Sequence, residues 1–139
     1  MSDPLPFSPT ITLLTVGRVW ESEYADALKP LGLTTRKYGL LGHIRRTPGI
    51  SFSELARRSR ITVQSAHSVV ASFVASSLVD DATAQAGAAS TLRITPEGEA
   101  LLTRAGAVVD TLDREFAAQH PELTEALRAH MRRVMSPTD

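Results

Sequence analysis

The chain has 139 residues, a length typical of one domain with a sizeable core. Its 15 basic and 15 acidic side chains cancel, so the net charge indicates no partner. The absence of cysteine excludes disulfides, thiolate metal sites and cysteine-based redox sensing. No apolar run is long enough to span a bilayer, and residues 1–9 lack the form of a signal peptide. We therefore expect a soluble cytoplasmic protein that makes no contact with a membrane.

Basic side chains are concentrated in one segment of the chain. From Arg36 to Arg60 there are seven Lys or Arg residues and one acid, Glu54. A positive segment in a neutral protein favours a polyanionic partner. The alternative is a solvated surface on which arginine serves as a good helix former.

Three helices are predicted in the first part of the chain. A long amphipathic helix follows the cap Ser8, and its apolar residues recur at three- and four-residue steps over about 9–29. Thr34 caps a second helix, which stops before Pro48. Residues 51–54 read Ser-Phe-Ser-Glu, a capping box that begins a short third helix.

The second part of the chain adds a hairpin between further helices. Thr62 caps a fourth helix, after which residues 78–79 and 91–94 are predicted as two strands with a flexible, alanine-rich tip between them. Thr95 caps another long helix, His120 and Pro121 interrupt it, and a last helix follows. The two ends of the chain carry apolar stripes that need a partner surface, and we therefore expect a homodimer. The stripes comprise Ile11, Leu13, Val16, Leu123, Leu127, Met131 and Val134.

The predicted order of elements is that of a winged helix-turn-helix. Two short capped helices, at 51–59 and 62–77, are separated by a brief turn and followed by a hairpin. A generic helical bundle would also contain capped amphipathic helices, but it would not place a strand–loop–strand insertion here. The turn, residues 59–61, lacks the usual glycine. The predicted fold class is mainly α with a two- to three-stranded β-wing.

The chain resembles the MarR family of bacterial regulators over roughly residues 10–135. The matching stretches are LTTRKYGLL at 33–41, PGISFSELARR at 48–58, SLV at 77–79 and LRITPEG at 92–98. The last two bracket the wing and are the most specific. The resemblance implies a triangular homodimer with a small-molecule site between the dimer interface and the DNA-binding lobes. It also implies one domain over 1–139, with a winged core at about 33–95, dimerisation helices at about 9–29 and 96–135, and a palindromic double-stranded operator.

The candidate DNA contacts depart from the family pattern. Recognition helices and wings of the family usually carry arginine, yet nothing between Ile61 and Leu92 is Lys or Arg, the wing tip at 82–90 included. Base reading would therefore fall to Gln64, Ser65, His67 and Ser68. Phosphate contacts would come from Arg36, Lys37, Arg57, Arg58, Arg60 and Arg93, and the predicted interface also includes the capping residues Ser51 and Thr62. The alternative for Gln64 and His67 is an ordinary polar helix surface.

Candidate effector residues lie on the long helices. Trp20, Tyr24 and Tyr38 could line a pocket for a small aromatic or hydrophobic effector, with polar contacts from Arg18 and His43. Plain core or interface packing is the alternative for the three aromatic residues. The four histidines make no metal-ligand spacing with carboxylates, and no Ser–His–Asp grouping is readable. We expect no metal, cofactor or catalytic residue.

The predicted function is sequence-specific DNA binding by a homodimeric transcriptional regulator that responds to a small effector. The alternative is a winged-helix protein-interaction module with weak or lost DNA binding. The cation-free recognition helix and wing motivate this second hypothesis.

Overall fold

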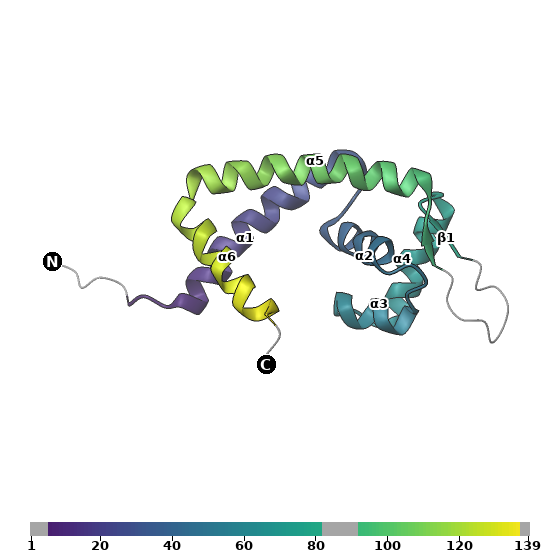
Figure 1. Cartoon of the computed structure of the whole chain (residues 1–139), viewed down its shortest axis with the longest axis horizontal. Helices are drawn as coiled ribbons and strands as arrows, with labels where there is room; N and C mark the ends of the chain where they lie inside the picture. The colour runs from purple at the N-terminus through teal and green to yellow at the C-terminus, as the bar shows by residue number, and fades with distance from the viewer. Residues whose placement is uncertain (1–5, 82–91, 137–139) are drawn as a thin grey trace.

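The computed structural model describes residues 6–81 and 92–136 as six α-helices, a 3-10 turn and a two-stranded sheet. Figure 1 shows α5 running along the whole molecule, with the lobe of α2, α3, α4 and the strands under one end and α1 and α6 under the other. This arrangement confirms the predicted winged fold, and the wing has two strands in the described residues. The elements are α1 Pro9–Leu28, η1 Lys29–Leu31, α2 Thr35–Arg46, α3 Phe52–Ser59, α4 Val63–Ala75, β1 Val79–Asp80, β2 Arg93–Ile94, α5 Pro96–Gln119 and α6 Pro121–Met135.

Side-chain caps begin five of the six helices at the predicted positions. A hydroxyl oxygen accepts a hydrogen bond from the backbone N–H three residues later in each case, which satisfies an otherwise unpaired donor. The capping residues are Ser8, Thr34, Ser51, Thr62 and Thr95. Helix α6 instead follows His120 with Pro121 at its first position and has no side-chain cap.

The hydrophobic core lies in the lobe and against the adjoining half of α5. Phe73 of α4 is 1% exposed, and it belongs to a buried cluster to which α2, α3, α4 and β1 all contribute. The other members include Leu40, Leu41, Ile44, Leu55, Val70, Val79, Leu92, Leu101 and Leu102. Helix α6, by contrast, buries no residue within the chain. None of the helices in the described ranges is long and apolar enough to cross a membrane.

The base of the wing is attached firmly to the start of α5. Strands β1 and β2 pair antiparallel, with Val79 opposite Ile94. The buried Thr95 hydroxyl donates to the Ser77 carbonyl oxygen at 2.6 Å and accepts from the Gly98 N–H at 3.0 Å. A Cβ on Gly98 would lie 2.3 Å from the Leu78 carbonyl oxygen, so only glycine allows this close approach. The predicted tip at 82–90 lies outside the described residues.

Candidate nucleic-acid interface and ligand pocket

The turn between α3 and α4 contains an arginine in a conformation that glycine usually supplies. Arg60 has φ 54° and ψ 44°, the left-handed region, and its N–H bonds to the last carbonyls of α3. Such a conformation costs a non-glycine residue about 1 kcal/mol. The turn therefore forms without the glycine that was missing from the sequence, and it exposes a cation between the two helices.

Exposed polar side chains occupy one face at the start of α4. Gln64, His67 and Ser68 are exposed, and their spacing of three and four residues places them together. The His67 ring stacks on Phe52 of α3, with centroids 3.8 Å apart and planes 16° apart. The Ser65 side chain is half-buried, and its hydroxyl oxygen accepts from the Thr62 hydroxyl at 2.8 Å. Ser65 and Thr62 thus serve first to begin the helix.

Two of the six candidate phosphate contacts are paired with a carboxylate. Glu54 accepts from Arg57 Nε at 2.9 Å and from Arg58 Nε at 2.8 Å, and Arg58 also donates to Thr47 Oγ1 at 2.9 Å. These hydrogen bonds lower the pKa of Glu54 to about 2. The capping box is consequently incomplete: the Ser51 hydroxyl caps α3, but the Glu54 carboxylate turns forward to the arginines.

The remaining candidate cations lie at three places on the lobe. Arg36 and Arg60 line one hollow together with His43, whose pKa is lowered by burial and by nearby arginines. Lys37 is half-buried and lines a different hollow beside Phe73. Arg93 is exposed on β2 and donates to the Leu92 carbonyl oxygen.

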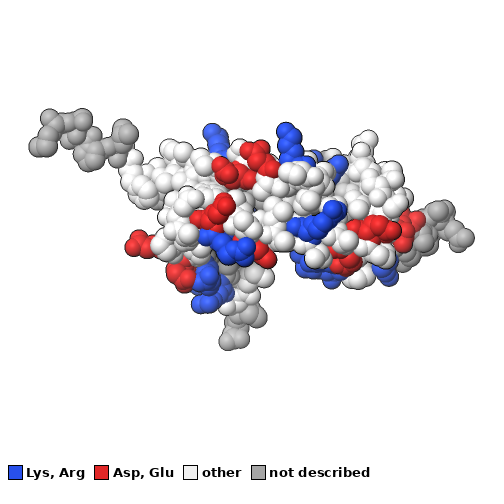
Figure 2. Space-filling view, turned by 90° about the horizontal axis from the view of Figure 1, so that it is seen from above, with Lys and Arg blue, Asp and Glu red and all other residues white. Residues whose placement is uncertain are grey.

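Charges of both signs cover another face of the molecule. Figure 2 shows the side seen from above in Figure 1, where blue Lys and Arg side chains alternate with red Asp and Glu. An ion pair between Arg45 and Glu99, 3.6 Å apart, joins α2 to α5. This face has no extended patch of one sign, so it does not match a polyanion.

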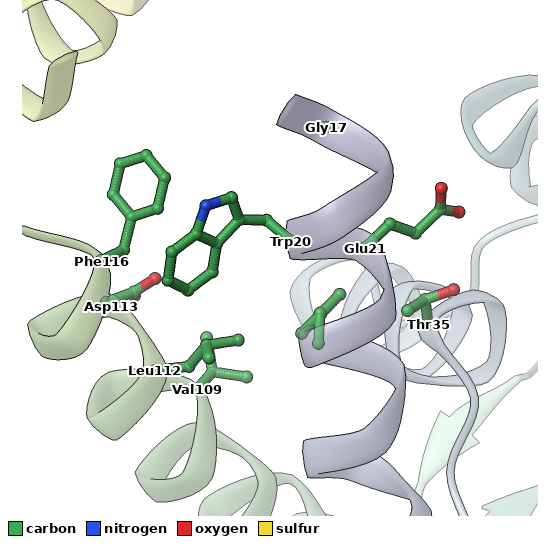
Figure 3. Close-up of a pocket in the computed structure, with 9 residues that line it drawn as sticks. Gly17, Trp20, Glu21, Thr35, Val109, Leu112, Asp113 and Phe116 are labelled. Carbon is green, nitrogen blue, oxygen red and sulfur yellow. The ribbon is translucent and has the colours of Figure 1, made fainter. Parts of the chain in front are cut away.

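A cavity of about 530 Å³ lies between α1, α5 and the start of α2. Each long helix contributes residues at i, i+3, i+4 and i+7, and Thr35 contributes from α2. In Figure 3 the indole of Trp20 points toward Phe116, and the two ring centroids are 4.8 Å apart. The lining residues are Gly17, Trp20, Glu21, Tyr24, Thr35, Val109, Leu112, Asp113 and Phe116.

Two of the five candidate effector residues line this cavity. They are Trp20 and Tyr24. Tyr38 does not line the cavity but packs edge-on against Tyr24. Arg18 follows the lining residue Gly17 on α1 and is exposed. His43 lies in the hollow beside Arg36. Sequence reasoning missed the α5 wall, although its residues repeat the same spacing as those of α1.

Comparisons with known proteins agree with the fold. A model of the MarR family matches residues 31–87. The HTH-type transcriptional repressor Rv2887 of Mycobacterium tuberculosis is 34% identical over 108 residues, 77% of this chain and 78% of the relative.

Solved structures extend the likeness to nearly the whole chain. The crystal structure of Mycobacterium tuberculosis MarR family protein Rv2887 in complex with DNA has a TM-score of 0.77 and 28% identity, covering 94% of this chain and 100% of that one. The same protein in complex with p-aminosalicylic acid has a TM-score of 0.74 and 30% identity over the same shares. The chain therefore belongs to the MarR family, whose members are DNA-binding transcriptional regulators with a winged helix-turn-helix and not enzymes.

Proposed function

We propose that this chain is a homodimeric transcriptional repressor that binds a palindromic operator and responds to a small effector in the cavity between α1 and α5. The observation that carries the proposal is the exposed polar face of α4, beside a left-handed turn that presents Arg60. The name of the relative and its complex with DNA support the assignment of a repressor. A repressor that acts on bacterial DNA would work in the cytoplasm.

The DNA contacts would divide between two sets of elements. Gln64, Ser65, His67 and Ser68 on α4 would face base edges, where Gln pairs bidentately with adenine and Ser or His gives single hydrogen bonds. Phosphates would be contacted by Arg36, Lys37, Arg57, Arg58, Arg60 and Arg93, with Ser51 and Thr62 at the starts of their helices. Specificity and affinity would thus come from different elements.

Exposed apolar side chains at one end of the molecule support the homodimer. Ile11 and Leu13 on α1 are 66% and 64% exposed, and Met131 and Val134 on α6 are 52% and 64% exposed. Exposed apolar side chains of this extent on two helices are typical of an interface. A second copy would cover it with the same residues, as two-fold symmetry requires.

The position of the cavity supports effector control. Its Thr35 begins α2 and directly precedes Arg36, and its α5 wall continues along the same helix to the wing base. A ligand that separates α1 from α5 would change the spacing of the two recognition helices. DNA accepts them only near one helical turn, about 34–36 Å, so a small rotation suffices for release.

The test is a salt-titrated binding assay with DNA from the protein's own upstream region. We expect preferential binding over random DNA, and Gln64→Ala should cost about 1–3 kcal/mol on the operator alone. Equal loss on both DNAs would mean that Gln64 does not read bases. Equal binding of both DNAs by the unaltered protein would favour the alternative, a protein-interaction module. Light scattering should return twice the 15.0 kDa chain mass, and a 15.0 kDa particle would contradict the dimer.

A further inference from the structure

The charge of the cavity between α1 and α5 is negative. Glu21 and Asp113 belong to its lining, and no Lys or Arg does among the described residues. Figure 3 shows the two carboxylate side chains on different sides, Asp113 near Trp20 and Glu21 toward Thr35. Asp113 also contributes to the raised pKa of Tyr24, after burial and Tyr38. A ligand in the cavity would therefore experience two nearby negative charges.

The cationic residues closest in sequence to the lining residues either line other hollows or are exposed to solvent. Arg36 follows Thr35 and lines, with Arg60, a hollow that adjoins the cavity at Thr35. Arg114 follows Asp113 and lines, with Arg128, a hollow between α5 and α6 that adjoins the cavity at Asp113 and Phe116. Arg18 is exposed on α1. The cavity thus offers a carboxylate ligand no cation from the described residues of this chain.

The remaining walls are aromatic and aliphatic. Trp20, Tyr24 and Phe116 contribute rings, and Val109 and Leu112 contribute aliphatic side chains. Ring faces attract cations through their quadrupoles, also in a site that is open to solvent, as this one is. The volume of about 530 Å³ is within the range of sites for small organic ligands.

We propose that this cavity selects an aromatic or hydrophobic amine in its cationic form over an aromatic carboxylate. This inference rests on the proposed effector site and names the chemistry of its ligand. It separates this chain from the relative, whose crystallised ligand is p-aminosalicylic acid. Asp113, which lies beside Trp20, would pair with the ammonium group, Glu21 would add to the negative potential from the other side, and Trp20 and Phe116 would contact the ligand ring.

Three probes of one shape test the proposal in the full-length protein. They are 3-phenylpropylamine, 3-phenylpropanol and 3-phenylpropanoate at neutral pH. Trp20 is the only tryptophan of the chain, so its fluorescence reports directly on the occupation of the cavity. We expect the amine to bind about tenfold more tightly than the carboxylate, with the alcohol between them.

Charge-neutralising variants assign the preference to the two carboxylates. Glu21→Gln combined with Asp113→Asn should reduce the ratio of amine to carboxylate affinity to about threefold or less and leave the alcohol unchanged, which also shows that the variant is folded. Glu23→Gln is the matched control, because Glu23 lies on α1 but lines a different hollow. It should leave the ratio unaltered.

The outcomes separate this inference from the proposed function. Tighter binding of the carboxylate, or a ratio that the double variant does not change, would overturn the cation preference while the effector site stands. If none of the three probes alters Trp20 fluorescence, both the preference and the effector site are wrong.

Discussion

Replacement of Glu54 by glutamine should increase DNA affinity and steepen its salt dependence. Each arginine that neutralises a phosphate adds about 0.9 to the slope of log affinity against log salt. With the exposed Arg36, Arg60 and Arg93 contacting phosphates in each subunit, and the half-buried Lys37 not counted, a dimer would have a slope of about −5. Arg57 has 71% of its side chain exposed and is held by Glu54, so Glu54→Gln should release it and bring the slope to about −7.

Arg58 sets the upper limit of this effect. It is bound by Thr47 as well as by Glu54, and its side chain is only 35% exposed. Full release of Arg58 in both subunits would add about 2 more to the slope. Because Thr47 keeps its hydrogen bond in the variant, we expect most of the change to come from Arg57.

The assay is fluorescence anisotropy with operator and random duplexes over a salt series. Both duplexes should gain affinity, since phosphate contacts carry no sequence information. Glu125→Gln is the matched control: Glu125 pairs with Arg128 three residues later on α6, far along the chain from the helix-turn-helix. An unchanged slope in Glu54→Gln, or a slope near −9 already in the unaltered protein, would show that the Glu54 pairs do not withhold these arginines from DNA.

Three further predictions concern the wing base and the turn. Thr95→Val removes a hydroxyl with two hydrogen bonds and should cost about 2–3 kcal/mol in urea unfolding, while Thr95→Ser should recover most of the loss. Gly98→Ala places a Cβ 2.3 Å from the Leu78 carbonyl oxygen and should cost about 1–3 kcal/mol, whereas Gly106→Ala, with nothing within 4 Å, should stabilise α5. A higher free energy of unfolding for Gly98→Ala than for Gly106→Ala would contradict this close approach. Arg60→Gly should raise stability by about 1 kcal/mol but weaken DNA binding, and a fall in both would show that the left-handed turn is not strained.

The helices could be predicted from sequence because their starts depend on local chemistry. A Ser or Thr hydroxyl at the cap accepts from the backbone N–H three residues later, which has no partner within the helix. Thr34 and Thr62 begin their helices in this way. The wing base was predicted from a change in hydrophobic period and confirmed as a two-stranded pairing. The direction of the Glu54 side chain could not be predicted, because three groups compete for its carboxylate within one turn of helix. Two guanidinium groups outcompete one backbone N–H, since a charged donor makes the stronger hydrogen bond.

The candidate site was less accessible to sequence reasoning. Trp20 and Tyr24 were identified by residue type, but the opposite wall required knowledge of which face of α5 meets α1. In the sequence Phe116 is an ordinary apolar residue of a long helix, whereas the structure places it edge-on to Trp20. Asp113 carried no signal at all, because an acid on a long helix is ordinarily a solvated residue. Its importance arises only from the side chains that surround it.

Helix α5 is the element that can carry a change at the cavity to the DNA. Its 24 residues form one unbroken helix, with Phe116 in the cavity wall near one end and Gly98 against the wing base near the other. At 1.5 Å per residue these two positions are about 27 Å apart, so a tilt of about 5° around the cavity would displace the wing base by about 2 Å. The close backbone approach at Gly98 leaves no space for the wing base to slide along the helix. On the proposed function, the wing base would therefore move with α5, and a ligand that alters the packing of α1 on α5 would act on the spacing of the DNA-binding lobes.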